Sequence, residues 1–293
     1  RSQIPRMQPE QPLDQGQVDD WSPSVRVGSA VSLAGYVNQI RERRYRSMRL
    51  TADIRDLAAR VAGSPDATPE TPQSLFRRAR ALDEWVRKNI SSGGSFDEAA
   101  SSILARREGR RDVLLLALLK AAGIPAELWL ARPENNPKLE SPLPDVLAYS
   151  EMLLAVAPDP DGTPLLWIDP LHRHTPTGLV RPLLRGAQAL RLVDSLSAPK
   201  NQAVQVMTIA LPPSGGTAQR LAAAHPEQNY KMLTDSRKVE LFAELSASGS
   251  AKVKVTETLT GNQAAEWRDQ VEHMAEDRLR QVLEQRALGY YFP

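Results

Sequence analysis

The 293-residue sequence contains no cysteine. This absence excludes disulfide bridges, thiolate metal sites and every mechanism that begins with a cysteine nucleophile. Aromatic residues are also few, at 5% of the chain. No apolar run approaches the roughly 20 residues that a membrane-spanning helix needs, and we therefore expect no direct insertion into a membrane.

The chain also lacks an excess of basic or of acidic residues. The chain carries 37 basic and 35 acidic residues, for a net charge of +2, and this balance argues against nucleic acid as a partner. The hydrophobic fraction of 41% and the charged fraction of 25% are ordinary for a globular protein with a core. The 23 prolines predict several linkers or rigid loops.

A buried helix organises the sequence. Residues 113–122 are rich in leucine and alanine and apolar almost all round, which is typical of a helix enclosed by other elements. Gly123 supplies a left-handed residue to end this helix, and Pro125 prevents it from resuming. Residues 127–131 then form a predicted strand.

Other periodic segments predict an α+β fold of two units. We expect further helices at 31–62, 75–90 (capped by Thr71), 96–105 and 266–286, and further strands at 152–156, 165–168, 203–211, 238–245 and 251–259. Residues 1–28, rich in proline, are predicted to be a linker or the end of an upstream domain. Residues 29–196 form one domain of helices on an antiparallel sheet, and residues 197–293 form a β-rich domain closed by a helix.

The sequence contains three motifs that follow one another in chain order. Leu115 to Ala126 has the sequence Leu-Leu-Ala-Leu-Leu-Lys-Ala-Ala-Gly-Ile-Pro-Ala, Tyr149-Ser150-Glu151 precedes a strand, and Trp167-Ile168-Asp169-Pro170 ends the next strand. This order resembles the bacterial transglutaminase-like superfamily, whose core is papain-like. The region after residue 197 also looks like the β-rich domain that follows this core in larger family members.

Active members of that family use a Cys-His-Asp triad, with the thiolate at the N-terminus of the central helix. By the family spacing, the cysteine position falls on Glu108. The histidine position falls on Glu151, or on Ser150 if the strand slips by one residue, and the aspartate is retained as Asp169. The resemblance therefore implies a degenerate site without catalytic residues.

If the three carboxylates converge, they must be protonated or bridged, for instance by Arg110 or Arg111. A second interpretation gives Glu108, Glu151 and Asp169 a catalytic role or a site for Mg²⁺ or Ca²⁺.

Other candidate sites are weaker. His172 and His174 could help to hold Zn²⁺ if they lay on a strand and so shared one face, but no third ligand is apparent, since His225 and His273 lie in other segments. A histidine pair in an exposed loop is the favoured interpretation. Ser150 lacks the Gly-x-Ser-x-Gly elbow of a serine nucleophile. Ser214-Gly215-Gly216 is too short for a phosphate-binding loop.

The sequence thus favours a catalytically inactive transglutaminase-like module that acts in protein binding or scaffolding. The resemblance implies a place in a larger bacterial cell-envelope protein, in or near the periplasm, with no cofactor. A protein or peptide is the expected partner, held in the groove left by the lost site, and the C-terminal Tyr290-Tyr291-Phe292 cluster either anchors on a partner or packs on its own domain. The alternative is a metal- or carboxylate-dependent hydrolase that uses the remodelled site.

Overall fold

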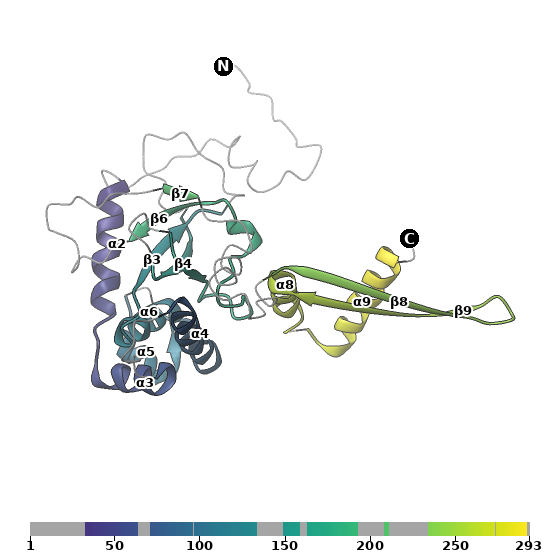
Figure 1. The fold of residues 1–293 in the computed structure, drawn as a ribbon, viewed down its shortest axis with the longest axis horizontal. Helices are drawn as coiled ribbons and strands as arrows, with labels where there is room; N and C mark the ends of the chain where they lie inside the picture. Colours follow the sequence, from purple (N-terminus) through teal and green to yellow (C-terminus); the bar gives the residue numbers. More distant parts are fainter. Residues whose placement is uncertain are drawn as a thin grey trace, which may run out of the picture.

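The computed structural model describes residues 33–63, 71–95, 97–133, 149–158, 163–192, 208–210, 234–272 and 274–291. Over these residues the protein is α+β, as predicted. Helices pack on an antiparallel sheet, and a long hairpin projects from this body (Figure 1).

Helices precede the sheet in the chain. They are α2 (Leu33–Ser47), α3 (Ala52–Ala62), α4 (Pro72–Asn89), α5 (Ala100–Arg106) and α6 (Arg111–Ala121). The predicted helical region 31–62 is therefore interrupted between α2 and α3. Thr71 caps α4 as predicted, because its Oγ1 accepts a hydrogen bond of 3.2 Å from the backbone N–H of Ser74.

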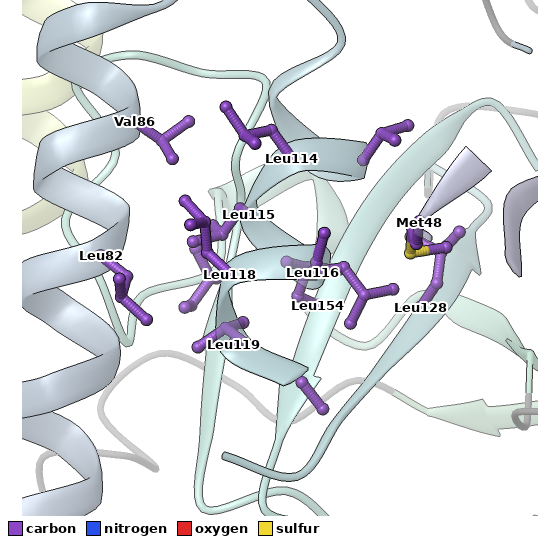
Figure 2. Packing of buried hydrophobic residues seen from close by; sticks show 14 of the residues in the cluster. Met48, Leu82, Val86, Leu114, Leu115, Leu116, Leu118, Leu119, Leu128 and Leu154 are labelled. Atoms are coloured by element: carbon purple, nitrogen blue, oxygen red, sulfur yellow. The ribbon is translucent and has the colours of Figure 1, made fainter. Parts of the chain in front are cut away.

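Helix α6 lies at the centre of the core. Every residue from Arg111 to Leu119 is buried, and its leucines contact both α4 and the sheet (Figure 2). Each fully buried leucine stabilises the fold by about 1.5–3 kcal/mol. The helix ends as expected at Gly123, which has a φ of 73°, and the Ile124 N–H donates to the Leu119 carbonyl at 2.9 Å.

The main sheet has the strand order β5-β4-β3-β6-β7, and each neighbouring pair is antiparallel. Its strands are β3 (Ala126–Ala131), β4 (Glu151–Val156), β5 (Leu166–Ile168), β6 (Gln188–Leu192) and β7 (Thr208–Ala210). One face carries Leu128, Leu154 and Ile168 into the core below the helices.

The opposite face of the sheet is buried too. Trp129, Leu153 and Trp167 pack there with Leu184 from the short 3₁₀ helix η1 (Pro182–Leu184). The two tryptophan rings meet edge to face with centroids 5.4 Å apart. Burial on both faces explains why these strands are continuously apolar instead of alternating.

One predicted strand belongs to a different unit than expected. The sequence placed 203–211 in the C-terminal domain, but β7 pairs with β6 in the main sheet. This pairing joins distant segments, so no local pattern reveals it. The predicted boundary at residues 196 and 197, and the predicted linker 1–28, lie outside the described residues.

The C-terminal unit consists of a hairpin and two helices. Strands β8 (Ser236–Leu245) and β9 (Ala251–Thr260) pair along their whole length, followed by α8 (Gly261–Val271) and α9 (Glu276–Tyr291). The prediction of one helix over 266–286 is wrong, because α8 ends at Val271 and a second helix, α9, begins at Glu276. Glu272 there contacts Arg173 and His174 of the first unit, a tertiary contact that helical periodicity does not encode.

Two contacts fix the base of the hairpin to the body. Arg185 pairs with Asp235 just before β8, and buried Asn262 at the start of α8 donates to the Val180 carbonyl at 3.0 Å. Among the described helices, none combines the length and apolarity needed to cross a bilayer.

Candidate functional site

The N-terminus of α6 does not carry Glu108. The helix begins at Arg111, with Arg110 as its N-cap residue. Glu108 lies earlier, exposed in the two-residue strand β2 (Glu108–Gly109), which pairs in parallel with β1 (Ser91–Ser92). Glu108, the position that the family spacing assigns to the cysteine, therefore lies outside the first turn of α6, to which the stabilisation of a negative charge by a helix N-terminus is confined.

A buried charge cluster occupies that helix end instead. Asp112, in the first turn of α6, lies 3.3 Å from Arg44 of α2 and 2.9 Å from the Nε of Arg110. The side chains of Arg44 and Asp112 are each only 1% exposed. Burial lowers the pKa of Arg44 to about 10, although the charge of Asp112 opposes this shift.

The same cluster contacts Met152, the residue that follows Glu151 in β4. Nη2 of Arg110 contacts the sulfur of Met152 at 2.8 Å, and Nη2 of Arg44 contacts it at 3.3 Å. The start of β4 therefore lies beside the N-terminus of α6. Both arginines are engaged, and the cluster offers no nucleophile.

The other two predicted site residues do come together, through an arginine. Arg181 donates from Nη2 to Oε2 of Glu151 at 2.6 Å and from Nε to Oδ2 of Asp169 at 2.5 Å. The expected bridge by Arg110 or Arg111 is wrong. Arg110 pairs with Asp112, and Arg111 donates its Nε to the Ile90 carbonyl at 2.9 Å.

Asp169 is held as a buried anion. Its side chain is 1% exposed, and its Oδ1 lies 3.1 Å from Nδ1 of His172. Burial alone would raise the pKa of Asp169, but the hydrogen bond to His172 and the charge of Arg181 together hold it below its usual value. The carboxylate therefore stays charged and paired, which makes it a poor base.

An arginine of helix α4 binds the backbone of the loop that follows Asp169. Arg87 donates to the backbone carbonyls of Asp169 at 2.9 Å and of Arg173 at 3.1 Å. Its Nε also binds Oδ1 of Asp83 at 2.8 Å, while Thr177 donates to Oδ2 of the same carboxylate at 2.6 Å. Burial raises the pKa of Asp83, against the opposing charge of Arg87.

The structure therefore unites two of the three predicted positions. Glu151 and Asp169 share the guanidinium of Arg181, whereas Glu108 is exposed in β2. Ser150 lies directly before β4 and is exposed. Sequence analysis missed Arg181, whose only local signal is a charged residue between Val180 and Pro182 in an apolar stretch.

The two histidines of the 172–174 segment diverge. His172 faces Asp169, while Nε2 of His174 lies 3.0 Å from Oε2 of Glu272 and 3.9 Å from Oδ1 of Asp269, both on α8. The segment is a turn and not a strand, so the favoured interpretation of a loop pair is confirmed and the two rings do not share the face of a strand.

No protein-family model matches this chain, and no curated protein matches it. Among solved structures, it is similar to a protein from Parabacteroides distasonis ATCC 8503 described as a putative protease, with a TM-score of 0.41 and 11% sequence identity. The alignment covers 78% of this chain and 52% of that protein, so this chain spans about half of its length. A likeness of this degree assigns no activity.

Proposed function

We propose that the protein is a catalytically inactive, transglutaminase-like module that binds a protein partner within a larger bacterial cell-envelope protein. The lack of cysteine in the whole chain supports the loss of transferase and protease chemistry. The closed Glu151–Arg181–Asp169 network supports it further, since an always-charged guanidinium occupies both remaining carboxylates.

The observation that carries the binding function is the surface of the β8–β9 hairpin. Every residue of β8 is exposed, including Leu241 at 60%, Phe242 at 61% and Leu245 at 80%. An isolated two-stranded hairpin is at best marginally stable in water. Contiguous exposed apolar side chains on such an element favour a binding surface.

The register shows that most of these side chains share one face. Val239, Leu241, Ala243 and Leu245 stand opposite Glu257, Val255, Val253 and Ala251, and alternate residues of a strand point to the same side. At the base of the hairpin this face continues into a groove of about 460 Å³ against α8 and α9, lined in part by Val255, Leu259, Trp267 and Leu283. Val255 belongs both to the groove and to this face of the hairpin, so the two adjoin, although Glu257, Arg268 and Arg286 also line the groove.

The occupant that fits is an extended strand of a protein partner with apolar side chains at alternate positions. Within the described part of the chain, β8 pairs only with β9, so the other edge of β8 presents its backbone for strand addition. The groove of the lost site is a poorer choice than the sequence suggested, because Arg181 bridges the two carboxylates there.

A selection from a displayed random peptide library tests this function. The wild-type chain should enrich peptides that alternate apolar and polar residues. The double substitution of Leu241→Lys with Leu245→Lys should weaken the binding of these peptides by more than about tenfold, equivalent to about 1.4 kcal/mol. The matched control, Lys252→Ser with Lys254→Ser on the opposite face, should bind normally. Peptides that bind the leucine variant as well as wild type would contradict the proposal.

The alternative of a metal- or carboxylate-dependent hydrolase at the remodelled site is less well supported. A metal held by Glu151 and Asp169 would have to displace Arg181 from contacts of 2.6 and 2.5 Å. Glu108, the third expected ligand, stands apart in β2. We therefore do not retain that function.

A further inference from the structure

A separate cluster of side chains joins the two units of the protein. His174 comes from the turn after β5, Asp269 comes from α8, and Glu272 is the C-cap residue of α8. One ligand atom from each of the three residues lies within 4.8 Å of the other two. We propose that these three residues bind a Zn²⁺ ion that links the 171–178 turn to α8.

The spacing of the atoms suits this ion. Zn²⁺ binds nitrogen and oxygen at about 2.0–2.2 Å, so ligands at the corners of a tetrahedron lie about 3.3–3.6 Å apart. Nε2 of His174 lies 3.0 Å from Oε2 of Glu272 and 3.9 Å from Oδ1 of Asp269. These two distances bracket the required value, and the two carboxylate oxygens lie within 4.8 Å of each other, so small side-chain movements would bring the three atoms to tetrahedral spacing.

The chemistry of the ligands selects among cations. An imidazole nitrogen with two carboxylates matches Zn²⁺, whereas Mg²⁺ and Ca²⁺ prefer oxygen ligands throughout. Two carboxylates and a neutral imidazole also balance the charge of a divalent ion. A water molecule would fill the fourth position of the tetrahedron.

Neighbouring groups hold the ligands in place. Asp269 and Glu272 are three residues apart on α8, a spacing that puts two side chains on one side of a helix. Arg173 donates from Nη1 to Oε1 of Glu272 at 2.6 Å, which turns Oε2 toward His174. Arg87 fixes the turn itself through the Arg173 carbonyl. Such outer contacts typically orient metal ligands.

This site is independent of the proposed binding function and of the Glu151–Arg181–Asp169 network. Its ligands come from elements of both units, so the ion would cross-link the hairpin unit to the sheet unit. The role is therefore structural, and the protein with Zn²⁺ should resist unfolding better than the protein without it.

Calorimetric titration of the metal-free chain with Zn²⁺ tests the site, with Co²⁺ absorption as a second readout of tetrahedral nitrogen and oxygen ligation. The chain has four histidines, and each is replaced by alanine in turn. We expect one Zn²⁺ per chain and a raised melting temperature. His174→Ala and Glu272→Gln should each weaken binding by more than about tenfold, whereas His172→Ala, the matched control, should retain it.

Three results would contradict the proposed Zn²⁺ site. If wild type and His174→Ala bind Zn²⁺ equally, or if neither binds it, the cluster is an ion pair only and the proposal is overturned. Loss of binding only on replacement of another histidine overturns it as well. Because His174 is partly exposed, its replacement should leave the fold intact, which circular dichroism verifies.

Discussion

At the scale of single residues, Arg181 decides the character of the site formed by Glu151 and Asp169. Its guanidinium neutralises the carboxylate of Asp169, which is almost fully buried, and the carboxylate of Glu151, which is partly exposed. Removing one member of a buried charge pair leaves the other desolvated and uncompensated, which costs more than the pair itself contributes.

Arg181→Met should therefore lower the free energy of unfolding by about 3–5 kcal/mol. Chemical denaturation measures this loss. Glu151→Gln is the matched control and should cost less, because the side chain of Glu151 is 24% exposed and water screens its charge. An Arg181→Met variant within about 1 kcal/mol of wild type would show that the network does not stabilise the fold.

The lowered pKa of Asp169 makes stability depend on pH. A carboxyl group with a folded pKa below its unfolded value of about 3.9 stabilises the fold above that value. This stabilisation is lost as the pH falls through the folded pKa. Denaturation curves should show that wild type loses more stability below about pH 4 than Asp169→Asn does. Parallel losses in the two proteins would contradict the assignment.

The sequence identified Asp169 and Glu151 because family spacing places them on adjacent strand ends. Arg181 could not be found in this way. It belongs to a loop that covers the opposite face of the sheet, and only the folded chain brings it between the two carboxylates.

At the scale of elements, α6 is the part on which α3, α4, α5 and the main sheet pack. Leu116→Ala should destabilise the protein by about 2–5 kcal/mol, because the side chain is fully buried and its removal leaves a cavity. Leu283→Ala, at a position 46% exposed on α9, should cost much less. Equal losses in thermal or chemical denaturation would show that α6 is not the centre of the core.

Elements with strong local signals were predicted best. The all-apolar run and Gly123 located α6 and its end, and the Thr71-Pro72 pair located the start of α4. The break between α8 and α9 was missed because no glycine or proline marks it in the sequence. The partner of β7 was missed because strand pairing across the chain has no local signature.

At the scale of the whole molecule, the two units differ in how they are stabilised. In the sheet unit, β3 and β4 are buried except for partly exposed Glu127 and Glu151, whereas β8 has no buried residue. The hairpin projects beyond the helices at its base (Figure 1).

Backbone amides in the outer hairpin, residues 241–255, should exchange with solvent much faster than those of β3 and β4. Few buried contacts oppose local opening there. Hydrogen exchange followed by mass spectrometry compares the two regions within one sample. Equal protection would mean that the hairpin is covered in the isolated chain, which would remove the surface on which the binding proposal depends.

The central proposal is that the Glu151–Arg181–Asp169 cluster is a structural ion-pair network without catalytic activity. Its most direct test is an assay of amide hydrolysis and acyl transfer on model glutamine and peptide substrates, with wild type and Asp169→Asn side by side. The account predicts no turnover above the uncatalysed rate for either protein. Turnover by wild type that disappears in a folded Asp169→Asn variant would contradict it.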